Sequence, residues 1–543
     1  MGMRTFLTAE AVLMMIAVAF SVRAEFCPNV RNDLARDNFI YRIATRYHVP
    51  PPASLFNQPM TVCDVLGFID KVDSLAALGR LSGQEIADAR QIRRLVSAEG
   101  GIVSWKNRDK DSRLNVRCNL EDTNSVSSGH DDKSFIRGIA SPTLNASLGR
   151  VSFYTNVDVW TDYRSDTVYK QSSYQPYDGI PYNLYGHADS SSVRSSDLLR
   201  GGLVYNGSMI RLELGIDRLR QGPAIASPLT FSGNAPPMTF VRGSIPFGFM
   251  DYTQAFGLLE SEKDKPKYFY MHRISVPFFS SRLIAGLTEV IVNGSTTNQQ
   301  TDSSDPLNGL RSEYYGQTRG WELAYMIPFV PYVFTEHYLG DRDNKALSFD
   351  VNLAFPDDFR WYTEFFIDDM TAPWSLFSNS WVNKWAMDIG GQYFTKFFSR
   401  DMTASIEYCR VEPWVYTHFY GGSHRYDNFN VPLGAPLGPN SDLLSLSCES
   451  RLFASHTFGV TFTNERTNHS YRGGNITDVF QDSGTVHPDS PIKEFLAADG
   501  RQTMTRCGIY WNYDQFGKFR ATVKYEYDFS GTSVFQVYGG LYF

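Results

Sequence analysis

Residues 520–529 read Arg-Ala-Thr-Val-Lys-Tyr-Glu-Tyr-Asp-Phe, so polar and apolar side chains alternate along the whole stretch. A period of two places the apolar side chains of a β-strand on one face and the polar ones on the other. The same alternation recurs in residues 151–159, 210–216 and 347–355. Strands of about ten residues cross a bilayer when tilted. Alternation alone, however, fits both a membrane barrel and a soluble β-sandwich.

The connections between candidate strands separate these two alternatives. The candidates lie near 146–160, 199–206, 209–219, 239–246, 254–260, 268–277, 282–292, 318–327, 331–339, 345–355, 360–367, 384–395, 402–412, 442–452, 455–464, 503–513, 518–528 and 532–543. Odd-numbered connections average about 20 residues and even-numbered ones about 4, the pattern of external loops and periplasmic turns. We therefore predict a mainly β protein, an antiparallel transmembrane β-barrel of about 18 strands over residues 145–543.

The composition excludes several other classes. The chain has 543 residues, with 51 Lys and Arg against 58 Asp and Glu, so its formal charge is −7. Mild acidity argues against nucleic acid as a partner. Beyond the N-terminus no apolar run approaches the roughly 20 residues of a spanning helix. Phe, Tyr and Trp number 39, 31 and 9, and abundant rings are typical of strands that meet a membrane interface.

The N-terminus predicts export. An apolar block from Ala11 to Phe20 follows Arg4, and residues 1–24 are expected to be a signal peptide cleaved after Ala24. Glu25 and Phe26 precede Cys27 and do not fit a lipid anchor. The terminal Phe543 is typical of barrel-insertion signals. The expected location is therefore the bacterial outer membrane, with outer-membrane lipids and the barrel-insertion machinery as partners.

A small helical bundle is expected over residues 25–105, with a polar linker over 106–144. Ser82 and Glu85 have the spacing of a capping box, and Pro50-Pro51-Pro52 ends the segment before the second helix. An even number of strands leaves both barrel ends, and hence the bundle, on the periplasmic side. There it is expected to plug the bore.

The six cysteines are too few for a disulfide framework. One disulfide among Cys27, Cys63 and Cys118 and a set of buried thiols remain equal alternatives. In the barrel, alternation directs Cys409 inward and Cys448 outward, so we expect both thiols to be free.

The external loops 368–383 and 413–441 concentrate aromatic rings beside polar groups. Sugar rings present C–H faces to aromatic rings and hydroxyls to polar groups, so these loops favour polysaccharide binding. The alternative is an aromatic girdle or packing of the loops on one another. The candidate contacts are Asp368, Asp369, Trp374, Trp381, Tyr416, His418, Tyr420 and Tyr426.

Catalysis is disfavoured because no nucleophile motif accompanies the paired Asp residues, and no catalytic residue is assigned. The spacing of His418 and His424 is a weak metal signal. No metal and no cofactor is expected.

Short motifs resemble the Wzi family of outer-membrane capsule assembly proteins. They are Arg31-Asn32-Asp33-Leu34, Gln221-Gly222-Pro223, Asn234-Ala235-Pro236-Pro237, Glu364 with Ile367-Asp368-Asp369, Tyr416-x-His418, Tyr426, Pro432-Leu433-Gly434, Gly438-Pro439 and Asp442. The sequence departs from the family where a Trp-Gly-Pro-Gly run is usual, because Gln221 and Ala224 occupy the outer positions.

The resemblance implies an 18-stranded barrel with a periplasmic bundle and a lectin-like role in anchoring capsular or other surface polysaccharide. The alternatives are a porin-like transport channel and an outer-membrane hydrolase. The sugar and the oligomeric state remain open.

Overall fold

The computed structural model describes residues 26–543 except 32, 98–100, 108–111, 130–132, 166–179, 182–192, 261–265, 296–318, 341–342, 399, 419–420, 454, 479–491 and 516–517. The predicted signal peptide, residues 1–24, lies outside the described residues. No helix of the described chain is long and apolar enough to span a membrane.

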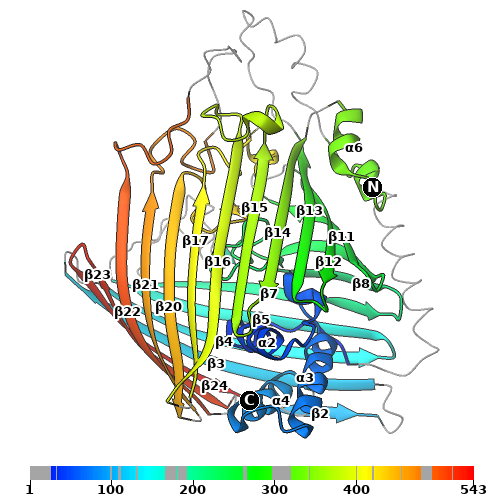
Figure 1. Cartoon of the computed structure of the whole chain (residues 1–543), viewed down its shortest axis with the longest axis vertical. Coiled ribbons are helices and arrows are strands. Elements are labelled where there is room, and N and C mark those ends of the chain that lie inside the picture. The colour runs from blue at the N-terminus through cyan, green and yellow to red at the C-terminus, as the bar shows by residue number, and fades with distance from the viewer. Residues whose placement is uncertain are drawn as a thin grey trace, which may run out of the picture.

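Within the described residues, eighteen antiparallel strands close into a barrel (Figure 1). They are β3 (Ser112–Ser128), β4 (Lys133–Leu148), β5 (Val151–Arg164), β7 (Val193–Asn206), β8 (Arg211–Asp217), β10 (Met238–Pro246), β11 (Asp251–Leu259), β12 (Lys267–Phe278), β13 (Leu283–Gly294), β14 (Asn344–Ala354), β15 (Phe359–Asp369), β16 (Lys384–Phe397), β17 (Arg400–Val411), β20 (Ser441–Phe453), β21 (His456–Thr467), β22 (Gln502–Gln515), β23 (Phe519–Asp528) and β24 (Thr532–Tyr542). β24 pairs with β3, which closes the sheet. Short strands β2 (Val103–Lys106) and β6 (Ile180–Pro181) pair with β3 and β7.

The predicted number of strands is confirmed. It is correct because two strands that the prediction missed, β3 and β4, are balanced by two predicted strands that the structure does not contain at 318–327 and 331–339. The predicted polar linker over 106–144 is wrong, because β3 and most of β4 lie there. The bore-facing side of β3 carries Asn, Arg, Glu, Thr and Ser side chains, and its outward face includes Asp122 and Asn124. Polar residues on both faces hide the alternation from which strands are recognised.

The predicted strands at 318–327 and 331–339 are also wrong. The described residues there form a short 3-10 helix, η3 (Leu323–Met326), and a helix, α6 (Tyr332–Tyr338). Pro328 and Pro331 lack the backbone N–H that a ladder needs, and proline is confined to strand edges and bulges. The apolar residues of this segment pack on the barrel without entering the sheet.

The alternation of connections is confirmed. Turns at one end of the barrel span two to four residues, as between β4 and β5 or between β16 and β17. Connections at the other end include residues 295–343, 412–440 and 468–501. β3 begins and β24 ends at the short-turn end, so the preceding helical bundle lies at that end (Figure 1).

The bundle occupies part of the bore. Its helices are α2 (Leu34–Tyr47), α3 (Val62–Ala77) and α4 (Gly83–Val96), and α3 and α4 each begin with a complete capping box. Its apolar core includes Ile284 and Phe394 of the barrel wall. Arg211 of β8 donates two hydrogen bonds to Asp64 of α3 at 2.7 and 2.8 Å. The bundle is therefore bound to the wall by packing and by charge.

The structure decides between the cysteine alternatives. Cys27 and Cys63 form a disulfide that ties the start of the described chain to α3, whereas Cys118 is free. Cys409 is buried in the core inside the bore, and Cys448 lies on the opposite, outward face of β20. Both barrel thiols are free, as predicted.

Candidate functional site

The connection between β8 and β10, residues 218–237, folds into the bore. The backbone N–H groups of residues 225–227 donate to the carboxylate of Glu407, at 2.8 to 2.9 Å. Two neighbouring N–H groups donate to Glu364 at 3.0 and 2.7 Å. At its start this loop pairs with the bundle through β9 (Arg220–Gln221) and β1 (Asn57–Gln58). We call residues 218–237 the plug loop.

Tyr416 and Tyr426, two of the predicted sugar contacts, pack on the plug loop. Their rings stack at 5.6 Å and are fully buried, and their hydroxyls donate to the carbonyls of Leu229 and Thr230 at 2.8 and 2.9 Å. Burial raises the pKa of both hydroxyls, which keeps them neutral. Gly434 is required beside them, because a Cβ there would lie 2.1 Å from the Leu229 oxygen.

Asp368 belongs to the same buried layer, where its Oδ2 accepts from the backbone N–H of Tyr416 at 2.7 Å. These three predicted residues pack the loops inside the bore and do not face solvent. Asp368, Tyr416 and Tyr426 therefore fit the alternative to sugar contact, in which the loops pack on one another.

Two histidines lie in the connection 412–440. His418 and His424 stack at 5.3 Å, and Ser423 Oγ lies 2.8 Å from His424 Nδ1. Burial lowers the pKa of both imidazoles, in His418 with help from the neighbouring His424 and Lys384. The described residues hold no group of three or more His, Cys, Asp or Glu side chains that fits a metal ion.

Three further predicted residues, Asp369, Trp374 and Trp381, lie at the rim. Trp374 is 90% exposed, and Asp369 lies 4.0 Å from the Lys384 ammonium. Trp381 is buried edge-on against Trp414, at 6.2 Å between ring centroids. Tyr420 lies outside the described residues.

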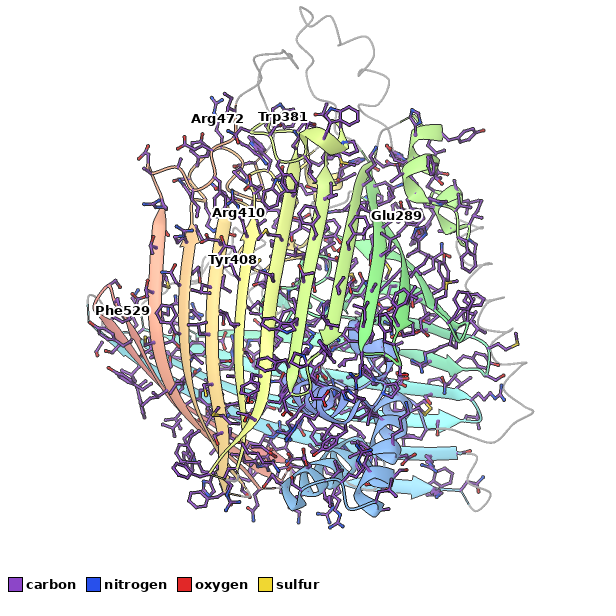
Figure 2. All side chains as sticks on the ribbon, in the orientation of Figure 1. Glu289, Trp381, Tyr408, Arg410, Arg472 and Phe529 are labelled. Carbon is purple, nitrogen blue, oxygen red and sulfur yellow. A yellow bond between two sulfur atoms is a disulfide. The ribbon has the colours of Figure 1, made fainter. Side chains whose placement is uncertain are left out.

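A pocket of about 310 Å³ opens at this rim. Its lining residues are Trp414, Tyr471, Arg472, Ile492 and Lys493. They come from the connections 412–440 and 468–501, and Figure 2 shows Arg472 and Trp381 at the same end of the molecule. We call this cavity the rim pocket.

The backbone fixes the indole of the rim pocket. The backbone N–H of Trp414 donates to the Gly473 carbonyl at 2.8 Å, and Gly473 has a φ of +72°. A Cβ on Gly473 would lie 2.5 Å from the indole, so only glycine fits. Lys493 lies 2.9 Å from Glu412, and burial lowers the pKa of its ammonium.

Sequence reasoning included Trp414 in an aromatic loop but missed Tyr471, Arg472 and Lys493. The signal available was Tyr471-Arg472-Gly473-Gly474, a ring and a cation followed by two glycines inside a long external connection. Which ring would face Trp414 depends on the packing of two loops, which no local pattern specifies.

A second, larger cavity of about 1530 Å³ lies at the short-turn end. It separates α2 and α4 of the bundle from β3–β5, β17 and β20–β24 of the wall, and charged side chains of both signs line it. The bundle thus fills one side of the bore and leaves the other side open to this cavity.

A closed barrel of eighteen strands with short turns at one end and long loops at the other defines a protein of the outer-membrane β-barrel class. The solved structure of Wzi, an outer-membrane protein involved in group 1 capsule assembly in Escherichia coli and a carbohydrate-binding β-barrel, is similar over 96% of this chain and 99% of that chain. The TM-score is 0.55 and the identity 13%, so the likeness shows a shared fold.

Two Pseudomonas aeruginosa barrels are more distant. OccK8 (OprE) has a TM-score of 0.41 at 9% identity, over 79% of this chain and 98% of that chain. OccK2 (OpdF) in complex with glucuronate has a TM-score of 0.40 at 9% identity, over 79% and 96%. No family model and no curated protein matches the sequence. The closed barrel and its likeness to Wzi support an outer-membrane location.

Proposed function

We propose that the protein binds surface polysaccharide outside the cell and retains it there, as a lectin-like attachment protein without catalytic activity. The observation that carries the proposal is the rim pocket, where two aromatic rings and two cations line a cavity at the long-loop end. It is supported by the similar fold of Wzi, a carbohydrate-binding barrel involved in capsule assembly.

The chemistry of the rim pocket suits a sugar that carries negative charge. The half-buried ring of Tyr471 offers a face for sugar C–H groups, and the exposed Arg472 offers up to five N–H donors to hydroxyl or carboxylate oxygens. The largely buried indole of Trp414 lines the pocket beside them. Lys493 is already paired with Glu412, so Arg472 supplies most of the charge. A polymer that engages several such weak sites at once is retained by avidity.

The contents of the rim pocket favour binding over hydrolysis. None of its five lining residues is an Asp, Glu or His that could act as a general acid or base. The nearby Asp368 is buried under the loops, where it accepts from a backbone N–H.

The test is glycan binding by the purified, folded full-length chain, with the surface polymer of its own host. We expect Tyr471→Ala and Arg472→Ala each to weaken binding at least tenfold, equivalent to about 1.4 kcal/mol. Arg400→Ala, an exposed arginine at the short-turn end, is the matched control and should bind like the wild type. Trp374→Ala tests the outer rim separately. Unchanged binding in both pocket variants would reject the rim pocket as the binding site.

The second candidate, a transport channel, is favoured by the open side of the bore. Arg506 and Lys524 face the bore from β22 and β23 with side chains 35% and 36% exposed, so the bundle does not cover them there. Steady ion conductance of the wild-type protein in planar bilayers would favour this function. Absence of conductance together with polymer binding would favour attachment.

A further inference from the structure

Part of the connection between β13 and β14 lies on the outer surface of the barrel. On β13, Val290 and Val292 belong to the core inside the bore, so the alternating Glu289 and Ile291 point outward. Ile291 packs with Tyr325 of η3 and Tyr332 of α6. α6 lies beside the outer edge of the barrel in Figure 1, and Glu289 lies at that same edge in Figure 2. We call residues 319–340 the wall segment.

The irregular backbone of the wall segment is bonded to side chains of the barrel wall. Three of its N–H groups donate to outward-facing oxygens of β11, β12 and β13. They are Phe329 to Tyr252 Oη at 3.0 Å, Glu322 to Tyr270 Oη at 2.7 Å, and Tyr332 to Glu289 Oε2 at 2.9 Å. In addition, Gln254 donates to the carbonyl of Tyr325 at 3.2 Å. Backbone that is neither helix nor sheet is tolerated at membrane depth where protein groups satisfy it.

The wall segment covers a hydrogen-bonded pair of ionisable side chains, His272 and Glu289, on the membrane side of the strands. His272 Nε2 lies 2.5 Å from Glu289 Oε2, and the imidazole stacks on Tyr332 at 4.2 Å. Ionisable groups facing hydrocarbon are costly and require partners or cover. At the far end of α6, Glu336 lies 3.0 Å from the Lys345 ammonium on β14.

The opposite face of the wall segment is apolar and exposed. Residues 323–335 include no charged side chain. Its exposed apolar side chains include Leu323, Ile327, Phe329, Val330, Val333, Phe334 and Tyr338, at 37% to 89%. They adjoin outward-facing wall residues that are exposed as well, Leu258, Leu287 and Phe349. The apolar surface of the wall segment thus continues the lipid-facing surface of the barrel.

We propose that the wall segment lies inside the membrane and that its exposed apolar face contacts the acyl chains of membrane lipids. It runs along the height of the strands that it covers. The Trp321 ring lies 4.6 Å from Tyr268 near the long-loop end of β12, and the Phe329 ring lies 5.9 Å from Phe247 in the short turn after β10. An external connection therefore re-enters the bilayer and replaces part of the lipid-facing wall.

Spin-label accessibility tests the proposal in protein reconstituted into phospholipid vesicles. The four free cysteines are replaced by Ser, and a nitroxide is placed at Phe334→Cys or Ile327→Cys. Phe349→Cys on the outward face of β14 is the lipid reference, and Trp374→Cys on the external rim is the water reference. Labels on the wall segment should collide with oxygen and avoid a water-soluble nickel complex, as the label at Phe349→Cys does.

Two outcomes would overturn the proposal. Accessibility to nickel like that at Trp374→Cys would place the wall segment in water, and protection from both reagents would place a second copy or another protein on it. Photolabelling of the wild-type protein with a membrane-dissolved reagent gives an independent readout, because peptides from residues 321–338 should be labelled.

Discussion

Removal of the Glu407 carboxylate should release the plug loop while the barrel stays intact. The carboxylate accepts from three consecutive N–H groups of residues 225–227 and from the Tyr362 hydroxyl at 2.6 Å. Each hydrogen bond to a charged group contributes about 1.5 to 3 kcal/mol, so the three backbone bonds together stabilise the docked loop by about 4.5 kcal/mol at the low end of that range. Glu407→Ala removes all of them and leaves three donors without this acceptor.

The assay is amide hydrogen exchange followed by mass spectrometry on the folded protein. Since 1.4 kcal/mol corresponds to a factor of ten, exchange at residues 225–227 should accelerate roughly a thousandfold or more in Glu407→Ala. Glu407→Gln, which keeps one carbonyl oxygen, should lie between the two. Glu449→Ala is the matched control, because this carboxylate lines the larger cavity and accepts from Tyr510. Wild-type exchange in Glu407→Ala with normal barrel circular dichroism would refute the reasoning.

Three further predictions concern the bundle and the external loops. Burial lowers the pKa of His418 and His424 below 6.5, so the loop stability that their neutral forms provide is complete above pH 6.5 and is lost as the pH falls. Limited proteolysis of 412–440 should therefore be faster at pH 5 than at pH 7.5, and His418→Gln should reduce the difference; equal rates in the wild type would contradict this. Arg211→Ala leaves Asp64 of α3 without its arginine and should cost about 3 kcal/mol, and Arg211→Ala with Asp64→Asn should cost less than the sum of the single changes in chemical denaturation. Alkylation of the unreduced, denatured protein should modify Cys118, Cys409, Cys448 and Cys507 and leave Cys27 and Cys63 unmodified; modification of Cys27 would show that the disulfide is absent.

The sequence was most informative where one physical constraint acts locally. The capping-box spacing of Ser82 and Glu85 predicted α4, and alternation with unequal connections predicted the barrel. Strand β3 was missed because polar side chains stand on its outward face as well as on the side that faces the cavity in the bore. The segment 318–339 was misassigned because the apolar residues of its described part cover the barrel wall from outside.

The candidate site was harder to predict, because the sequence of a loop does not indicate which way its aromatic side chains point. Tyr416 turns inward to the plug loop, whereas Trp414, two residues earlier, lines the rim pocket. Both have positive φ angles, 70° and 73°, which tertiary contacts impose and local sequence does not encode.

The seam between β24 and β3 joins the last strand of the barrel to the first, directly after the bundle. The barrel can therefore close only after the chain up to Tyr542 has folded into the sheet. The segments that lie inside the bore become enclosed when this seam forms. The helices α2, α3 and α4 precede β3 in the polypeptide, so they are synthesised before any strand of the barrel. A chain that stops before β24 leaves one edge of β3 unpaired, and the helices then lie against an open sheet.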